Sequence, residues 1–146
     1  MSQYHIRTYR YDGFADRFYL KPTVHWNGEN MEVWAVLDTG ANITHVSKRV
    51  IEKLNPKWIG NIESVSAYSK YKTSKYKLNI TFSEFGTFPE VTVGVLEQIQ
   101  PVADLIVGMD LITKFDFAIT SDEDGNTILS LRYPSKKKPI DFNEDD

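Results

Sequence analysis

The chain of 146 residues contains no cysteine. This absence excludes disulfide bonds, thiolate metal sites and a cysteine nucleophile, so the fold must depend on its packed core. No run of residues approaches the roughly 18–20 apolar positions that a membrane-spanning helix needs. Residues 1–20 are polar and aromatic and lack the apolar segment of a signal peptide. We therefore expect a cytoplasmic protein with no membrane partner.

The sequence also lacks a strong excess of charge of one sign. It has 17 Lys and Arg against 20 Asp and Glu, a formal net charge of −3. A dedicated nucleic-acid-binding domain would usually carry a strongly basic face, so we expect no nucleic-acid partner. Hydrophobic residues make up 41% and charged residues 25%, as in an ordinary globular protein, and the length fits a single domain.

Hydrophobic residues alternate with polar ones through most of residues 17–37, which predicts two β-strands. Between the strands lies Asn27-Gly28, a dipeptide that accepts the positive φ angles of a type I′ turn. The segment therefore predicts a β-hairpin. Pro22 interrupts the first strand, and because proline has no N–H, it indicates an edge position or a bulge.

The remainder of the chain predicts one short helix and several further strands. Apolar residues recur at helical spacing over residues 48–54, with Ser47 as the N-cap and Asn55-Pro56 at the end. Strand patterns follow at residues 61–82, 91–95, 104–108, 115–119 and 129–131, with a turn at Asp124-Gly125. These elements predict a mostly-β domain with one or two short helices and a closed or partly closed sheet.

The most informative segment is the end of the predicted hairpin, where an apolar strand leads directly into Asp38. A carboxylate at the end of a buried strand is costly unless it is hydrogen-bonded or paired. Thr39 supplies a hydroxyl, and Gly40 allows the backbone to turn sharply and to approach a ligand closely. Asp-Thr-Gly by itself is also compatible with a simple turn.

Two motifs together go beyond a simple turn. The block from Phe18 to Ser47, which contains AVLDTGANITHVS, resembles the start of a retropepsin-type aspartic protease domain. Later, Ile106-Val107-Gly108 followed by Met109-Asp110-Leu111 resembles the second motif of this family. The resemblance covers residues 17–134 and is greatest to the single-domain bacterial and cellular members. It implies a retropepsin-like β-barrel at 17–134, which leaves residues 1–16 as an N-terminal arm. The basic and then acidic residues after Pro134 predict a flexible charged tail at 135–146.

The resemblance also implies roles for particular residues. Asp38 would be the catalytic carboxylate, and Thr39 would join two active-site loops across a two-fold axis. Gly40 and Ala41 would shape the loop that faces the substrate. Residues Ile106, Val107 and Gly108 would brace this loop from behind. The hairpin at 62–82 would be a flap over the substrate, with binding residues Val65, Ser66, Ala67, Tyr68 and Tyr71.

The function implied by the resemblance is an aspartic endopeptidase that acts as a homodimer, with one Asp38 from each chain. Two carboxylates in close contact cannot both ionise, so in this family the pair shares one proton. The ionised member takes a proton from a water molecule, which attacks the peptide carbonyl of a peptide or protein substrate. The protonated member stabilises the oxyanion and assists departure of the amine. This chemistry needs neither a metal nor an organic cofactor.

Several features leave alternatives open. Residues 61–85 contain no glycine, although flaps of this family commonly do, and they carry Lys70, Lys72, Lys75 and Lys77 instead. These lysines indicate either a lid that prefers acidic peptides or a solvated hairpin protected from aggregation. The same fold could serve as a catalytically silent peptide-binding or dimerisation module. Residues 1–16 or the acidic tail could also block the cleft until they are removed.

The remaining polar and aromatic groups carry weaker signals. Viral members have an Arg-Asn pair where this chain has Met109 and Asp110, so ion pairs that depend on that arginine are not expected. His5, His25 and His45 lack the spacing of metal ligands, and we expect no metal site. Residues 122–126 look like a calcium loop but lack its bidentate glutamate, which favours an acidic turn. The tyrosine-rich start predicts either an interface arm or an edge strand.

Overall fold

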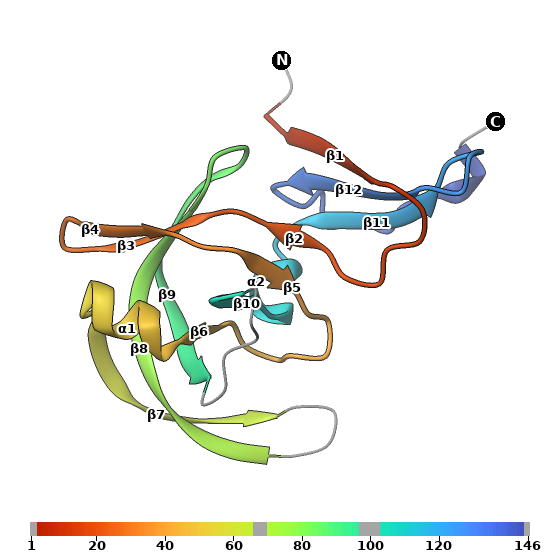
Figure 1. Ribbon diagram of the computed structural model, residues 1–146. Helices are drawn as coiled ribbons and strands as arrows, with labels where there is room; N and C mark the ends of the chain where they lie inside the picture. Colours follow the sequence, from red (N-terminus) through yellow and green to blue (C-terminus); the bar gives the residue numbers. More distant parts are fainter. Residues whose placement is uncertain (1–2, 66–69, 97–102, 145–146) are drawn as a thin grey trace.

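A computed structural model describes residues 3–65, 70–96 and 103–144 (Figure 1). Its secondary structure is almost entirely β, with two short α-helices and a terminal 3-10 turn. The elements in chain order are β1 (His5–Tyr11), β2 (Tyr19–Leu20), β3 (Thr23–Trp26), β4 (Glu29–Glu32), β5 (Ala35–Leu37), β6 (His45–Ser47), α1 (Lys48–Leu54), β7 (Lys57–Val65), β8 (Lys70–Phe82), β9 (Gly86–Leu96), β10 (Leu105–Val107), α2 (Met109–Ile112), β11 (Asp116–Ser121), β12 (Thr127–Tyr133) and η1 (Phe142–Glu144).

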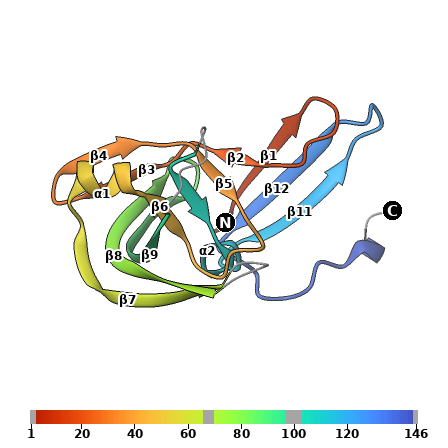
Figure 2. The same ribbon diagram turned by 60° about the horizontal axis from the view of Figure 1, so that its bottom comes forward.

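The described strands form two sheets. The larger one curls into a half-barrel in the order β2-β5-β10-β6-β9-β8-β3-β4, with β7 paired to β8 (Figure 1). The smaller sheet has the order β1-β12-β11 and lies at one end of the half-barrel (Figures 1 and 2). This arrangement confirms the predicted mostly-β fold. The tyrosine-rich start of the chain forms β1, an edge strand of the smaller sheet.

The first hairpin forms where the sequence predicts it. β3 and β4 pair antiparallel, and the turn residues Asn27 and Gly28 have φ angles of 48° and 84°, as a type I′ turn requires. The pairing continues as β2 with β5 after an interruption at Pro22, where the Val33 N–H donates to the Pro22 carbonyl at 3.0 Å. Proline cannot donate a return hydrogen bond, so one long predicted hairpin is divided into two short ones.

Helix α1 also begins and ends as predicted. The Ser47 hydroxyl accepts a hydrogen bond from Val50 N at 3.4 Å, and Asn55 takes a left-handed conformation after the last turn. Ser47 Oγ also donates to Asp104 Oδ1 at 2.8 Å, and Arg49 forms an ion pair with the same carboxylate. The hydrogen bond from Arg49 lowers the pKa of Asp104 in spite of its burial. These contacts fasten the start of the helix to the chain just before β10.

One hydrophobic core joins the half-barrel to the smaller sheet. Leu78, Ile80 and Leu105 of the larger sheet and Leu129 of β12 are fully buried in the same cluster. Burial of such a side chain contributes about 1.5–3 kcal/mol relative to exposure. At the edge of this core, the Tyr9 hydroxyl donates to Glu84 Oε2 at 2.9 Å, which connects β1 to the turn between β8 and β9. The smaller sheet is therefore packed firmly on the barrel.

Helices in the described part of the chain are too short to cross a membrane.

Candidate active site

Asp38 follows β5 at the point where a later strand is inserted into the sheet. β10 lies between β5 and β6, parallel to the first and antiparallel to the second. The connection at residues 38–44, which we call the Asp38 loop, must therefore pass round the end of β10 (Figure 1). The Asp38 N–H donates to the Val107 carbonyl at 2.9 Å, which continues the pairing of the two strands. This topology fixes where Asp38 leaves the sheet.

The carboxylate of Asp38 is oriented by its own loop. Gly40 N donates to Asp38 Oδ1 at 2.8 Å, and Ala41 N donates to the Asp38 carbonyl at 3.2 Å. Asp38 is half-buried, whereas Thr39 and Gly40 are exposed. The three residues therefore present an oriented carboxylate at the surface of a single chain.

The end of β10 lies directly against the Asp38 loop. A Cβ atom on Gly108 would stand only 2.5 Å from the Ile43 carbonyl oxygen and 3.0 Å from that of Ala41. Met109 N donates to the Ala41 carbonyl at 2.8 Å. Only glycine allows so close an approach of two backbones. The structure thus brings Gly108 into contact with the loop, while Ile106 and Val107 lie in the strand beside β5.

A second anchor of the loop involves residues that the sequence did not single out as a site. Asp110 Oδ2 accepts a hydrogen bond from Thr44 N at 3.1 Å, and Asp110 Oδ1 accepts one from Thr44 Oγ1 at 2.8 Å. Thr44 is fully buried, and its hydroxyl in turn accepts from Gly108 N at 3.2 Å. Asp110 therefore closes the far end of the Asp38 loop against α2. The only signal for this contact in the sequence was that Asp110 lies in the segment that resembles the second motif of the family.

His45 is buried beside this anchor. Its Nδ1 donates to the Ile43 carbonyl at 3.0 Å, and its ring lies against Gly94, where a Cβ atom would be 2.8 Å away. Burial lowers the pKa of His45, although the Ile43 carbonyl, Asp110 and Asp38 act in the opposite direction. The imidazole is therefore neutral at pH 7. Within the described residues, no three His, Asp or Glu side chains gather as metal ligands would.

A small apolar cluster lies beside the Asp38 loop. Val36 and Asp38 are two residues apart on one strand and so point to the same face. Val36 lies opposite Tyr19 on one side and Ile106 on the other, and Ile106 lies opposite His45. Val36, Ile106 and Ala103 form a hydrophobic cluster separate from the main core. All three side chains are buried, and Ala41 of the Asp38 loop packs against their cluster.

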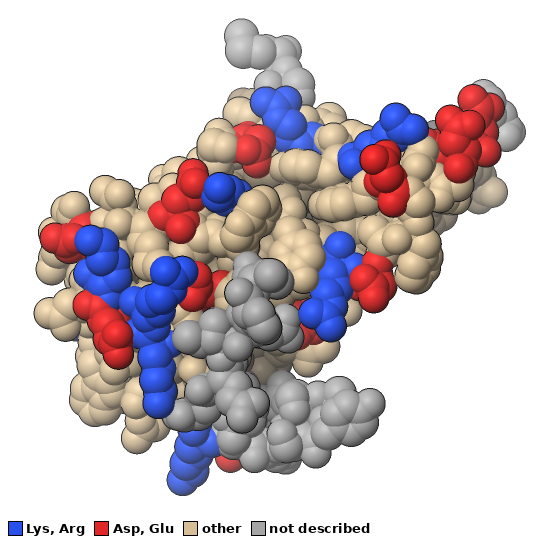
Figure 3. All heavy atoms as spheres, in the orientation of Figure 1, with Lys and Arg blue, Asp and Glu red and all other residues tan. Residues whose placement is uncertain are grey.

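The predicted flap corresponds to the β7–β8 hairpin, which has a bulge between Trp58 and Gly60. Val65 ends β7 and Tyr71 lies near the start of β8, whereas Ser66, Ala67 and Tyr68 lie outside the described residues. Lys72 lies opposite Glu63 in the hairpin. Over the face shown in Figure 3, basic and acidic side chains are interspersed. The visible charges therefore do not single out an acidic substrate.

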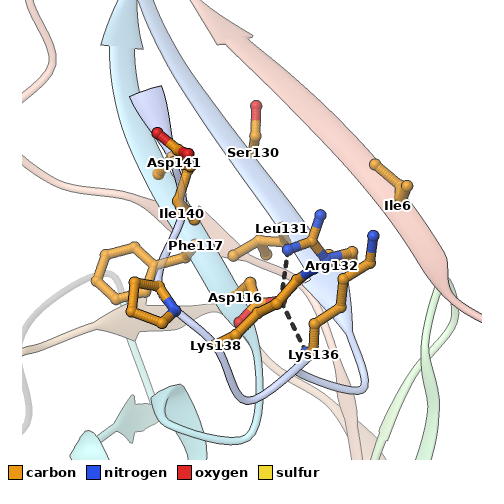
Figure 4. Close-up of a pocket in the computed structure, with 12 residues that line it drawn as sticks. Ile6, Asp116, Phe117, Ser130, Leu131, Arg132, Lys136, Lys138, Ile140 and Asp141 are labelled. Carbon is orange, nitrogen blue, oxygen red and sulfur yellow. Dashed lines mark hydrogen bonds and ion pairs between the residues drawn. The ribbon is translucent and has the colours of Figure 1, made fainter. Parts of the chain in front are cut away.

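A well-defined cavity lies away from Asp38. Its volume is about 510 Å³, and it lies between the smaller sheet and residues 136–141 (Figure 4). At its base, Asp116 accepts hydrogen bonds from Arg132 Nε at 2.9 Å, Ser135 Oγ at 2.7 Å and Lys136 N at 2.9 Å. Burial would raise the pKa of Asp116, but these hydrogen bonds together lower it. Neither Asp38 nor any other residue of its loop lines this cavity.

Comparisons with known proteins agree with this geometry. A search of the curated proteins found no match. Among solved structures, the chain is similar to a retropepsin-like aspartic protease from Rickettsia conorii, with 20% identity and a TM-score of 0.57 over 90% of this chain and 94% of that one. This likeness confirms the predicted retropepsin-like fold. The family model described as aspartyl protease matches residues 23–111, which include both Asp38 and Gly108. This match extends over more than half of the sequence, and the chain therefore belongs to the aspartyl protease family.

Proposed function

We propose that the protein is an aspartic endopeptidase whose active site forms from the Asp38 residues of two chains. The observation that carries this proposal is the placement of the Asp38 carboxylate. It directly follows β5, is half-buried, and is oriented by a hydrogen bond from Gly40 N. The aspartyl protease family match supports the same chemistry. We assign the catalytic domain to residues 17–134.

The reaction requires two carboxylates, and a single chain supplies one Asp-Thr-Gly motif. In the pair, one carboxylate is protonated and the other ionised, because two adjacent negative charges repel strongly. The ionised Asp38 accepts a proton from a water molecule held between them. The resulting hydroxide attacks the peptide carbonyl, and the protonated Asp38 stabilises the oxyanion and then gives its proton to the leaving amine. After the product amine and acid depart, the pair again holds one proton, now on the carboxyl group that began ionised, and because the two Asp38 residues are equivalent the site is ready for another cycle.

The surroundings of Asp38 suit this role. Thr39 and Gly40 are exposed in one chain, so a second copy can approach them, and the Thr39 hydroxyl would bridge the two loops. Ala41, half-buried in the Asp38 loop, would face the substrate backbone. The β7–β8 hairpin, with Val65 at the end of β7 and Tyr71 near the start of β8, would close over the bound peptide.

The test compares wild-type protein with Asp38→Asn, which keeps the shape of the side chain but cannot supply an ionised carboxylate. We expect the wild type to cleave unfolded protein substrates, with a pH optimum bounded by two ionisations, and Asp38→Asn to lose activity by at least about 10³-fold. Asp141→Asn, an exposed substitution in the tail, is the matched control and should retain full activity. Circular dichroism establishes that each variant is folded.

Activity that survives Asp38→Asn would reject the mechanism. A wild-type dimer that binds peptides but cleaves none at any pH would instead support a silent peptide-binding module, an alternative motivated by the absence of glycine from residues 61–85. Activity that appears only after removal of residues 1–16 or of the tail would identify a self-blocked precursor.

A further inference from the structure

The cavity between the smaller sheet and residues 136–141, which we call the tail cavity, has no part in the proposed peptidase chemistry. Its volume of about 510 Å³ lies within the range of about 300–1,000 Å³ that is usual for small-molecule sites. Its lining includes no residue of the Asp38 loop. A cavity of this size that the proposed function leaves unused is a candidate site for a separate ligand.

One wall of the tail cavity is the outer face of the smaller sheet. Ile6 of β1 lies opposite Arg132 of β12, and Arg132 lies opposite Asp116 of β11, so the three side chains share one face. Leu129, on the other face of β12, is fully buried in the main core. The wall is therefore part of a sheet that is packed firmly from behind.

The other wall is held by hydrogen bonds to β11 and to the residues before it. Ser135 N donates to the Lys114 carbonyl at 3.0 Å, and Ser135 Oγ donates to Asp116 Oδ1 at 2.7 Å. Lys136 N donates to Asp116 Oδ2 at 2.9 Å. Because both walls are in place before a ligand arrives, binding would cost little conformational entropy.

Charged groups of the two signs are unequal in number in this lining. The three cationic and two acidic residues are Arg132, Lys136, Lys138, Asp116 and Asp141. Asp116 is already paired with Arg132, whose Nη2 lies 2.7 Å from its Oδ2. Asp141 Oδ1 accepts a hydrogen bond from Asn143 N at 2.9 Å. The lining therefore has a formal excess of one positive charge and two carboxylates that already have partners, which favours an anion over a cation.

Arg132 retains donors for such an anion. Its Nε and Nη2 both contact Asp116 Oδ2, at 2.9 and 2.7 Å. Within the part of the chain that the structure describes, Nη1 makes no hydrogen bond or ion pair, and neither does the ammonium group of Lys138. One nitrogen of the Arg132 side chain points away from Asp116 (Figure 4). Because this side chain is only 26% exposed, water and salt screen a carboxylate bound there less than one on a surface lysine.

Apolar surface lies beside these donors. Ile6 on β1 and Ile140 in the tail are 58% and 43% exposed, and both line the tail cavity (Figure 4). An aliphatic group that covers them would remove apolar surface from water, which contributes about 25 cal/mol for each Å². The cavity therefore offers an apolar surface and cationic donors to one ligand.

We propose that the tail cavity binds an organic acid with one carboxylate and an aliphatic portion. The carboxylate accepts hydrogen bonds from Arg132 Nη1 and Lys138, and the aliphatic portion covers Ile6 and Ile140. One negative charge balances the excess in the lining, whereas a phosphate group, with a charge of about −1.5 to −2 at pH 7, exceeds it. Fatty acids and peptide C-termini both have this chemistry. The inference goes beyond the proposed function, because the tail cavity shares no residue with the Asp38 loop.

The experiment is a titration of the wild-type protein with octanoate, followed by ¹H–¹⁵N NMR. We expect saturable shifts at the backbone amides around the tail cavity and none at Gly40 or Ala41. Octanamide has the same chain without the charge and should bind at least about tenfold more weakly, because it cannot accept a charge-assisted hydrogen bond. Acetyl-leucyl-leucine, a peptide acid, replaces octanoate in a parallel titration. Saturable binding of either acid supports the site, and the tighter of the two identifies a fatty acid or a peptide C-terminus as the source of the carboxylate.

Matched variants test the two cations. Lys138→Gln and Lys137→Gln remove the same charge from adjacent positions, but Lys137 does not line the cavity. We expect Lys138→Gln to weaken octanoate binding about three- to fivefold and Lys137→Gln to have little effect. Arg132→Lys keeps a positive charge for Asp116 but loses the second donor nitrogen, and it should weaken binding about tenfold. Thermal unfolding shows whether each variant keeps its fold.

Equal binding of octanoate and octanamide would overturn the proposal, and so would equal effects of Lys138→Gln and Lys137→Gln. Shifts that gather elsewhere on the protein, or the absence of saturation by about 10 mM of either acid, would also overturn it. The titration needs no peptidase activity. The ligand site and the proposed function can therefore fail independently of each other.

Discussion

Asp110 holds Thr44 through both oxygens of its carboxylate, one bonded to the backbone N–H and the other to the hydroxyl. Thr44 lies at the end of the loop that begins with Asp38, and Asp110 lies in the first turn of α2. The contact therefore joins the two motifs of the family, which are far apart in the sequence. Because the Thr44 hydroxyl also accepts from Gly108 N, the three residues form one buried network.

We expect Asp110→Ala to destabilise the protein by about 2–3 kcal/mol. The substitution removes a carboxylate and leaves the buried N–H and hydroxyl of Thr44 without their acceptor. Urea denaturation monitored by circular dichroism measures the change in the free energy of unfolding. Asp141→Ala, in the exposed tail, is the matched control and should change it by less than about 0.5 kcal/mol. Equal effects of the two substitutions would show that the Asp110–Thr44 contact does not stabilise the loop.

Gly108→Ala should be among the most damaging single-methyl additions to this chain. The added Cβ would stand 2.5 Å from the Ile43 carbonyl oxygen, and a backbone atom cannot rotate away as a side chain can. We expect a loss of about 3 kcal/mol, at the upper end for overpacking. Gly125→Ala provides a contrast, because Gly125 has a φ of 81° and open space around it. Its cost should be about 1–2 kcal/mol from conformational strain alone. The reverse order of the two variants would contradict this interpretation.

Several turns and helix ends of the fold follow from residues that are close together in the sequence. The Asn27-Gly28 turn and the helix after Ser47 are confirmed, because each depends on backbone preferences within a few residues. The division of the first hairpin at Pro22 also follows from a missing N–H. The sequence likewise left open whether the tyrosine-rich start forms an edge strand, and β1 is one.

Other features could not be predicted from residue patterns. Nothing in the local sequence of Asp110 indicates that Thr44 is its partner, because a hydrogen bond across 66 residues depends on the fold. The resemblance implied that residues 106–108 brace the Asp38 loop, but the insertion of β10 between β5 and β6 was not predicted. The hydrogen bonds that hold the loop between β1 and β2 are made to Asn126 and Thr127, which are distant in the sequence. Long-range hydrogen bonds, such as those between Thr44 and Asp110, hold the Asp38 loop in place.

His45 should make stability depend on pH between neutral and mildly acid conditions. Its pKa is lowered in the folded state by burial, so the unfolded chain binds a proton more readily. The free energy of unfolding must then decrease as pH falls below about 6.5, until the pKa of the folded state is passed. His45→Asn keeps a side-chain N–H for the Ile43 carbonyl and removes the titration. We expect a flatter stability profile between about pH 7 and pH 5 for this variant.

The exposed His5 supplies the control for that comparison. His5→Asn replaces a histidine on the exposed surface of β1 by the same residue and is therefore the matched substitution. The difference between the His45→Asn profile and the wild-type profile isolates His45, since every other titrating group is shared by these two proteins. Identical profiles for His45→Asn and the wild type would mean that the buried imidazole is not held neutral by the fold.

A mixing experiment tests whether each active site needs Asp38 from both chains. When wild type is incubated with an equal amount of Asp38→Asn until subunits exchange, random pairing leaves about half of the original number of fully wild-type dimers. Because a mixed dimer has only one ionisable Asp38, we expect activity to fall to about half, and further with an excess of the variant. The same mixture assayed before exchange should keep full activity. Activity that stays constant after exchange, followed by light scattering with a size-tagged variant, would mean that one Asp38 suffices and that the shared-proton mechanism does not operate.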